Sequence, residues 1–403
     1  MVHMWMTIIS LEKVMLLPHK DTLVPSLVQL CKFSLNVFLC NLRPKNMAAT
    51  NKVLVAAAVV AAFAALIGYR FLQLKEISLS TREVTVKHLN CHYLNNIEYG
   101  AEDITILKDG LAFLSTGLKF PGLPSFSDEP GKMYILDLLH PKPTPVELQI
   151  KGDLDLSSFN PHGISVYIDE AEDSVYLFVV NHPEDKSQVE IFHFVQENTL
   201  VHLKTITHPL LHSVNDIVAV GEENFYATNY RSSSIDALHL LTVLLGLPRC
   251  DVVYYSPKEV RVAADSIMSA NGINISPCKR YIYVSDIIDH EVDVFERQEG
   301  EQLVYLKSVA VGSLCDNVDV DHKTGDVWLG CHPNGIKLSQ YDPEDPPGSE
   351  IIKIKNIHSE QPLVTQEYVD NGRVIMGSTV AAPYEGKLLI GTVFHKALYC
   401  DLK

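Results

Sequence analysis

Seven oxygen-bearing side chains lie at the starts of predicted strands and could together bind a hard cation. Carboxylate and amide oxygens select calcium or magnesium over zinc or copper. Calcium accepts about six to eight oxygens in a loose geometry, whereas magnesium requires a stricter octahedron. Any single Asp or Asn at a strand start could simply bond the local backbone, but recurrence at equivalent positions favours calcium. The seven residues are Glu102, Asp103, Asn215, Asp216, Asn271, Asp316 and Asn317.

Three histidines occur near the same positions and could supply a general base. His162 begins one repeat, His182 ends the second strand of that repeat, and His332 ends a second strand later in the chain. A lone histidine at a strand end is usually only a hydrogen-bonded polar residue. Two histidines in one repeat, beside a predicted cation site, favour a base that activates water, because imidazole titrates near neutral pH.

Composition and missing motifs exclude several other functions. The sequence contains no G-x-S-x-G, H-E-x-x-H, P-loop or G-x-G-x-x-G motif, which excludes common serine hydrolases and H-E-x-x-H zinc proteases. The net charge of −16 disfavours a nucleic-acid partner. This acidity suits a protein that holds cations, although it could also serve solubility alone. With 47% hydrophobic residues, the chain can bury a substantial core.

The elements that carry these residues form a sixfold repeat. Each copy is a polar pair followed by an alternating apolar strand, a turn and a second apolar strand. A period of about 40–60 residues with paired short strands indicates a β-propeller with one blade per repeat. We therefore predict an all-β, six-bladed propeller with a few accessory helices, in which the polar pairs converge on the central axis. The copies begin at Glu102, His162, Asn215, Asn271, Asp316 and Ser378, and second strands are predicted at 176–181, 225–229, 281–286, 327–331 and 388–392.

The region before the repeats has a different character. Residues 53–69 form an uncharged run rich in Ala and Val, between Lys52 and Arg70. This run reaches the lower limit for a membrane span and also fits the core of a signal peptide. Because residues 71–74 continue the apolar character, we predict a retained hydrophobic signal-anchor. The chain is thus divided into an N-terminal extension at 1–46 ahead of an alternative start at Met47, a signal-anchor at 47–81, and a catalytic propeller at 82–403.

The cysteines after the N-terminal extension fall into two groups. Cys91 and Cys400 bracket the repeats, and a secretory route would permit a disulfide that joins the first and last blades. In the chain-entropy model, closing so long a loop stabilises the fold by about 4–5 kcal/mol. The others lack the C-x-x-C spacing of a metal site, and most of them are predicted to be packed thiols; they are Cys250, Cys278, Cys315 and Cys331.

One stretch departs from the strand pattern. Residues 232–247 have the apolar spacing of a helix after a serine that could cap it. Two interpretations stay open: the helix packs on the propeller, or it covers a site or touches lipid. The apolar residues are Ile235, Leu238, Leu241, Leu244 and Leu245.

Several segments closely resemble the paraoxonase/arylesterase family, over a region that runs from about Arg82 to the C-terminus. The resemblance implies a six-bladed propeller with two calcium ions in its channel. It also implies hydrolysis of lactones, aryl esters and, as a side activity, organophosphates. The segments are E-D-I-T-I-L, S-F-N-P-H-G-I-S, F-V-V-N-H-P-E, N-D-I-V-A-V, V-V-Y-Y-S-P, A-N-G-I-N-I-S-P, G-C-H-P-N-G and G-K-L-L-I-G-T-V-F-H-K-A-L-Y-C.

The same resemblance implies roles for individual residues. His162 would be the base that activates water, and His182 would orient it. The family disulfide corresponds to Cys91 and Cys400, and the family's free cysteine corresponds to Cys331. The catalytic calcium would be held by Glu102, Asn215, Asn271, Asp316 and Asn317. A structural calcium would be held by Asp103, Asp216 and the backbone carbonyl of Ile164.

The chain departs from the family pattern near the expected mouth of the channel. After Thr228 and Asn229 the family usually continues with Asp-His, whereas this chain has Tyr230 and Arg231. The exchange removes a carboxylate and an imidazole. It would change the substrate range, and with it the rate, without touching the calcium ligands.

Two functions from different classes follow. The first is a calcium-dependent hydrolase of lactones and aryl esters, in which calcium polarises the carbonyl and a histidine-assisted water attacks it. The second is a non-catalytic, calcium-stabilised propeller that binds a lipoprotein or membrane surface. The five-ligand set with His162 and His182 favours the hydrolase, because a scaffold needs neither a vacant calcium position nor a base. The expected location is the secretory pathway, with the protein extracellular, lipoprotein-associated or membrane-associated.

Overall fold

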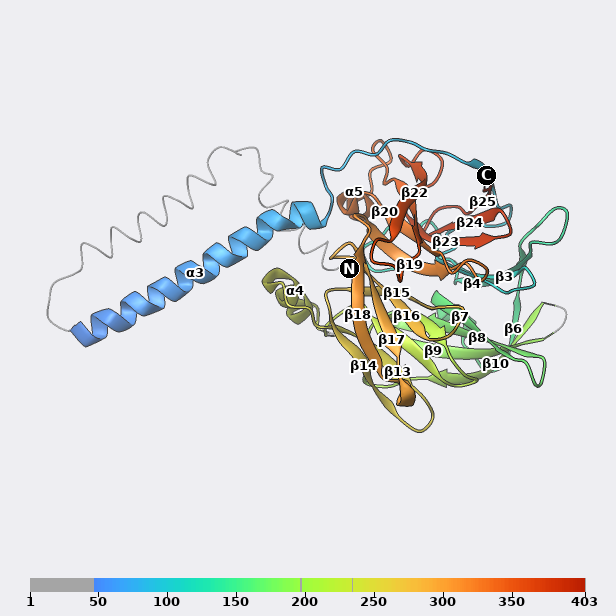
Figure 1. The fold of residues 1–403 in the computed structure, drawn as a ribbon, viewed down its shortest axis with the longest axis horizontal. Helices are drawn as coiled ribbons and strands as arrows, with labels where there is room; N and C mark the ends of the chain where they lie inside the picture. Colours follow the sequence, from blue (N-terminus) through green and yellow to red (C-terminus); the bar gives the residue numbers. More distant parts are fainter. Residues whose placement is uncertain (1–46, 196–197, 234, 403) are drawn as a thin grey trace.

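The computed structural model describes residues 47–195, 198–233 and 235–402, so the N-terminal extension predicted at 1–46 lies outside the described residues. Across the described part of the chain, the strands form six sheets, each of four or five strands. Neighbouring strands within each sheet are antiparallel, except for one short parallel pair. This arrangement confirms the predicted six-bladed propeller, whose blades can be followed along the chain in Figure 1.

The first three blades take up the chain from Asp103 to Ile267. Blade 1 contains β2 (Asp103–Ile106), β3 (Leu111–Thr116), β4 (Lys132–Asp137) and β5 (Val146–Glu147). Blade 2 contains β6 (Gln149–Lys151), β7 (Pro161–Asp169), β8 (Ser174–Asn181), β9 (Gln188–Val195) and β10 (Thr199–Ile206). Blade 3 contains β11 (Val214–Ala219), β12 (Phe225–Asn229), β13 (Cys250–Tyr255) and β14 (Val260–Ile267).

The other three blades complete the ring. Blade 4 contains β15 (Ala270–Ile275), β16 (Tyr281–Asp286), β17 (Glu291–Arg297) and β18 (Leu303–Ala310). Blade 5 contains β19 (Leu314–Val320), β20 (Val327–His332), β21 (Ser349–Lys355) and β22 (Leu363–Asp370). Blade 6 contains β23 (Ser378–Tyr384), β24 (Lys387–Thr392), β25 (Leu398–Asp401) and β1 (Asn90–Tyr93).

The second strands β8, β12 and β16 are rich in β-branched and aromatic residues, which suit a pleated and buried surface. All five residues of β12 are buried, as are the last five of β8. These strands are apolar on both faces because each blade packs between two neighbours. Phe113 of blade 1, for example, shares a core cluster with Leu177 and Phe192 of blade 2. The predicted second strands therefore coincide with β8, β12, β16, β20 and β24.

The ring closes in blade 6, where the N-terminal strand β1 pairs with the C-terminal strand β25. Cys91 lies opposite Cys400 in this pair, and the two form a disulfide across 309 residues of sequence. The structure thus contains the closing disulfide that the sequence predicts.

A second disulfide corrects the expectation of packed thiols. Cys315 and Cys331 are bonded to each other, so Cys331 is not the free cysteine that the resemblance implies. The antiparallel register of β19 and β20 places the two residues directly opposite each other, with a Cα–Cα distance of 3.9 Å. That register cannot be read from the spacing of the two cysteines in the sequence. Cys250 is a buried thiol as predicted, whereas Cys278 is exposed.

Three α-helices accompany the described strands: α3 (Met47–Ile77), α4 (Asp236–Leu245) and α5 (Gly335–Gln340). Figure 1 shows α3, which covers most of the predicted signal-anchor, extending away from the blades with α4 near its C-terminal half. Arg70 of α3 donates a 3.4 Å hydrogen bond to the carbonyl of Val243 in α4. Among the described residues, no helix combines the length and apolar content needed to cross a membrane.

The structure shortens the helix predicted at 232–247 and corrects its cap. The N-cap is Ile235 with no side-chain hydrogen bond, and the Oγ of Ser232 instead lies 2.8 Å from the Oγ1 of Thr242. The helix ends at Leu245 and is capped by Gly246, whose φ of 66° is a left-handed conformation that glycine adopts without strain. One face packs on the propeller through Val243, while Leu238 and Leu241 on another face are exposed. The helix thus both packs on the propeller and leaves apolar side chains in solvent.

Candidate active site

The polar pairs of the repeat lie in β-bulges of the first strands. The pairing register shifts within β7, β11, β15, β19 and β23, at the same point of each repeat. A bulge adds an unpaired residue and re-aims the side chains near it. The residues within or directly beside these shifts are His162, Asn215, Asp216, Asn271, Asp316, Asn317 and Thr379, and Glu102 directly precedes β2.

Two glycines in the polar pairs let adjacent first strands approach closely. A Cβ at Gly163 would lie 2.3 Å from Oδ1 of Asp216, and one at Gly272 would lie 2.5 Å from the Cα of Asn317. Any other residue would push the neighbouring bulge outward. The glycines of the His-Gly and Asn-Gly copies therefore bring the polar side chains of adjacent blades together.

The predicted ligands of the catalytic calcium converge around Glu102, which is 1% exposed. Nδ2 of Asn317 lies 3.1 Å from Oε1 of Glu102 and 2.9 Å from its backbone carbonyl. Nε2 of His162 lies 3.5 Å from the same Oε1 atom and 3.4 Å from Nδ2 of Asn215. Residues from blades 1, 2, 3 and 5 thus meet, although they are separated by up to 215 positions in sequence.

Four oxygen atoms in this group are buried and accept no hydrogen bond: Oε2 of Glu102, Oδ1 of Asn215, Oδ1 of Asn271 and Oδ1 of Asn317. Buried polar atoms nearly always have a partner, and leaving one without a partner costs about 1–3 kcal/mol. Burial, followed by the charge of Asp316, also raises the pKa of the Glu102 carboxyl well above its usual range. Unpartnered oxygens beside crowded carboxylates are the surroundings that a divalent cation would satisfy.

The five residues fit calcium better than a softer metal, because all five offer oxygen and three are neutral amides. Within the described ranges, no group of three or more His, Cys, Asp and Glu side chains is placed to hold a metal ion. A cation here would therefore depend on the asparagine oxygens.

The second predicted set, Asp103, Asp216 and Ile164, is arranged differently. Both carboxylates are buried, and both oxygens of each accept a backbone N–H. Ile164 takes part through its N–H, which donates to Oδ2 of Asp103 at 2.8 Å. Burial, then the charge of Glu102, raises the pKa of Asp103 to about 8. These carboxylates tie neighbouring blades together, and their oxygens retain lone pairs for a cation.

The two predicted catalytic histidines are in contact and their tautomers follow from their partners. Nδ1 of His182 lies 3.0 Å from the carbonyl of Lys186, so this nitrogen carries the proton and donates. Nε2 of neutral His182 is then an acceptor, and it lies 3.0 Å from Nδ1 of His162. Nδ1 of His162 therefore donates, which leaves a lone pair on Nε2 among the ligand residues. Burial lowers the pKa of His162 to about 4, so the ring is neutral at pH 7.

His332 has a defined partner that sequence reasoning did not identify. Its Nε2 lies 2.9 Å from Oδ2 of Asp316, and the ring is 2% exposed. The histidine ends β20 beside the bulge of β19, so the cross-strand register makes this contact. The only signal in the sequence was its place at a strand end.

The polar group forms the floor of a hollow whose walls are apolar. Phe120, Leu118 and Leu123 line it from the loop after β3, and Leu338 and Val393 line it from blades 5 and 6. The Phe120 ring lies 5.6 Å from the His162 ring and 5.5 Å from the Tyr230 ring. Tyr230, at the point where the chain departs from the family, therefore packs on Phe120, one of the lining residues. No motif in the sequence marks the apolar lining residues.

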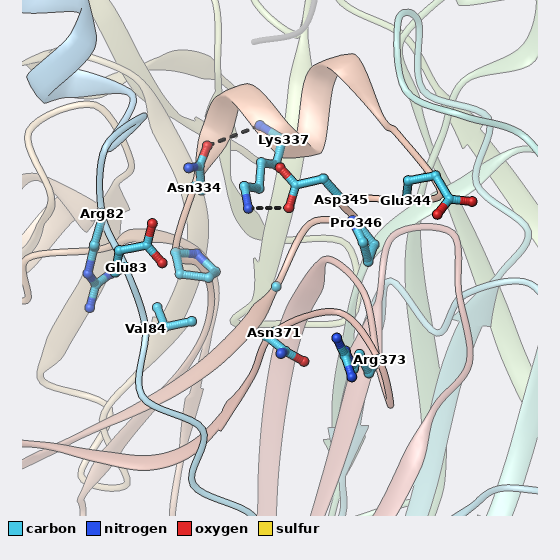
Figure 2. Close-up of a pocket in the computed structure, with 12 residues that line it drawn as sticks. Arg82, Glu83, Val84, Asn334, Lys337, Glu344, Asp345, Pro346, Asn371 and Arg373 are labelled. Carbon is cyan, nitrogen blue, oxygen red and sulfur yellow. Dashed lines mark hydrogen bonds and ion pairs between the residues drawn. The ribbon is translucent and has the colours of Figure 1, made fainter.

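A second hollow, of about 270 Å³, contains none of the predicted site residues. Figure 2 shows it between the segment at Arg82, Glu83 and Val84 and the helix α5. Within it, Lys337 forms a 2.5 Å ion pair with Asp345. Its lining carries charges of both signs and no histidine, so it offers no counterpart to the pair of His162 and His182.

Comparison with known proteins shows the family to which the chain belongs. The family model for Arylesterase matches residues 83–402. Serum paraoxonase/arylesterase 2 of Gallus gallus is 54% identical over 350 residues, which cover 86% of this chain and 99% of that protein. The Homo sapiens protein of the same name is 53% identical over 352 residues, 87% of this chain and 99% of that protein. Serum paraoxonase/lactonase 3 of Homo sapiens is 49% identical over 340 residues, 84% of this chain and 96% of that protein. With its propeller and the matched region covering the whole site, the chain belongs to the paraoxonase/arylesterase family.

Proposed function

We propose that the protein is a calcium-dependent hydrolase of lactones and aryl esters, acting at the hollow above Glu102 and His162. The observation that carries the proposal is the set of four buried, unpartnered oxygens beside a histidine whose unprotonated Nε2 lies among the same residues. Relatives named paraoxonase, arylesterase and lactonase support the substrate classes.

The cation would be held by Glu102, Asn215, Asn271, Asp316 and Asn317. When bound, calcium supplies a Lewis acid that polarises an ester carbonyl and stabilises the charge that develops on its oxygen. Two carboxylates balance the charge of a divalent ion, and the three amides do not weaken its Lewis acidity further. The second pair, Asp103 and Asp216, would hold a structural ion through lone pairs that their backbone donors leave free.

The protein's own residues perform the proton transfer. Nε2 of His162 accepts a proton from water as the water attacks the carbonyl. His182 holds the ring in the required tautomer, since its Nε2 accepts from Nδ1 of His162 and its Nδ1 donates to the carbonyl of Lys186. The wall of Phe120, Leu118 and Val393 binds the apolar part of the substrate and excludes other water.

The test is hydrolysis of a lactone series, phenyl acetate and an organophosphate triester by the purified wild-type protein and by His162→Gln. We expect turnover of lactones and phenyl acetate by the wild type, with kcat lowered about 10²- to 10⁴-fold in the variant. A folded, calcium-loaded wild type that hydrolyses neither class would contradict the proposal. That result would favour the alternative, a non-catalytic propeller that binds a lipoprotein or membrane surface.

The proposed setting is the secretory pathway, with the protein docked on a lipid surface. Two disulfides suit an oxidising compartment. Exposed apolar side chains on α3, such as Phe63, and on α4, such as Leu238 and Leu241, would enter the interface. Replacing Leu238 and Leu241 with Ser should reduce binding to phosphatidylcholine vesicles without lowering the melting temperature. Unchanged binding would remove α4 from the docking surface.

A further inference from the structure

The Cys315–Cys331 disulfide lies at the base of the bulge that carries two of the proposed calcium ligands. Cys315 is the last regularly paired residue of β19 before the register shifts, and Asp316 and Asn317 follow it directly. On the partner strand, Cys331 directly precedes His332, whose Nε2 lies 2.9 Å from Oδ2 of Asp316. The covalent bond therefore joins the two chain segments that place Asp316.

Three other blades have a hydrogen bond at the same point of the repeat. Asn181, Asn229 and Asp286 each lie opposite the residue that precedes a bulge, as Cys331 does in blade 5. Their Oδ1 atoms accept the backbone N–H of the residue two positions before the bulge: Asn160 at 2.9 Å, Ser213 at 3.1 Å and Ser269 at 3.1 Å. This side-chain bond clamps the base of each bulge. Cysteine cannot reproduce it, and blade 5 has the disulfide instead.

The surrounding blades hold the backbone of the same two cysteines. Oγ of Ser285 in blade 4 donates to the carbonyl of Cys315 at 2.7 Å, and Oγ of Ser378 in blade 6 donates to the carbonyl of Cys331 at 2.9 Å. Both cysteines are buried. The disulfide thus connects two points that are already anchored to opposite neighbours, which leaves the bulge between them little freedom.

We propose that the Cys315–Cys331 disulfide is a positioning element of the calcium site, the covalent counterpart of the asparagine clamps in blades 2 and 3. It holds the fifth-blade bulge so that Asp316 and Asn317 present their oxygens to the ion in one arrangement. The proposal rests on the proposed function, because it takes these two residues as ligands of the catalytic calcium. Its prediction concerns calcium affinity, not the chemistry of hydrolysis.

The first test measures calcium binding to the calcium-depleted protein by titration calorimetry, for Cys315→Val, Cys331→Val and the double variant. Residues that orient metal ligands typically contribute about 10- to 100-fold to affinity. We expect each single variant to lower the calcium affinity of the catalytic site about tenfold. The double variant should lower this affinity by the same amount. Equal single and double effects follow if one shared bond is the cause, whereas independent packing losses would add.

A rescue pair separates the clamp from simple filling of space. In a Cys315→Val background, Cys331→Asn can restore a hydrogen bond of the kind made by Asn229, whereas the similarly sized Cys331→Leu cannot. We expect the asparagine variant to recover most of the calcium affinity and the leucine variant to recover none. Cys91→Ser with Cys400→Ser is the matched control, because that disulfide lies away from the ligands; it should lower the melting temperature and leave calcium affinity unchanged.

Three results would overturn the proposal. One is calcium affinity within about twofold of the wild type in all Cys315 and Cys331 variants, with only the melting temperature lowered. Another is equal affinity in the asparagine and leucine variants. The third is peptide mapping that finds reduced thiols at both positions in the folded wild type. If the wild type binds calcium but hydrolyses no ester, the proposed function fails while the calorimetric comparison still decides the role of the disulfide.

Discussion

Asn271→Leu separates a binding role for the ligand group from a purely structural one. The Asn271 side chain is buried, and neither its Oδ1 nor its Nδ2 has a hydrogen-bond partner in the protein. Without a cation, this amide only destabilises the fold, by about 1–3 kcal/mol for a buried polar group without a partner. Leucine has nearly the same shape and removes that penalty. In calcium-free buffer, the free energy of unfolding of the variant should therefore be about 1–3 kcal/mol higher than that of the wild type.

With calcium present, the wild type should instead be more stable than the Asn271→Leu variant. The wild type gains stability by mass action when the ion binds only the folded state, whereas the variant has lost a ligand and gains less. Urea unfolding of both proteins, with calcium and with verified calcium removal, measures the crossover. Asn229→Leu is the matched control, because that amide accepts from Ser213 and donates to Leu210 and Asp251. It should destabilise the fold under both conditions. An Asn271→Leu variant less stable than the wild type without calcium would refute the reasoning.

Three further predictions follow from the site. In calcium-free protein, burial raises the folded-state pKa of Asp103 to about 8, above the value of about 4 in an unfolded chain. Between these two pKa values the folded state therefore binds more protons than the unfolded chain. As the pH rises from 5 to 7, the free energy of unfolding should fall by about 1.4 kcal/mol per pH unit. A urea midpoint that rises over this pH range would contradict the prediction. His182→Ala should lower kcat less than His162→Gln does, with KM unchanged, and an unchanged kcat would remove His182 from the dyad. Tyr230→Ala should raise KM for phenyl acetate about twofold to tenfold through loss of the aromatic contact with Phe120, and an equal effect on an aliphatic lactone would contradict a ring-specific wall.

The repeat pattern predicted the architecture because period and alternation are properties of the sequence itself. The polar pairs at Glu102, His162 and Asn215 indicated where the first strands begin. The symmetry of a propeller then predicted that these residues lie close together. The closing Cys91–Cys400 bond followed from the same reasoning, since the ends of a propeller must meet.

What the sequence could not reveal depends on register and on three-dimensional packing. The bulges that aim the polar side chains need the pairing of two strands, as does the Cys315–Cys331 bond. The partnership of His332 with Asp316 crosses between strands in the same way. For the helix at α4, a serine at the expected position suggested a cap, but Ser232 bonds to Thr242 because the helix begins later. Strand pairing decided the first three cases, and the later start of the helix decided the fourth.

The central claim is that hydrolysis depends on calcium held by the five converging residues. The most direct measurement is the rate of lactone and phenyl acetate hydrolysis by the wild-type protein after calcium removal, verified by atomic absorption, and again after calcium is restored. The account predicts loss of activity on removal, a lower melting temperature, and recovery of both on restoration. Full activity in protein shown to contain no calcium would contradict it.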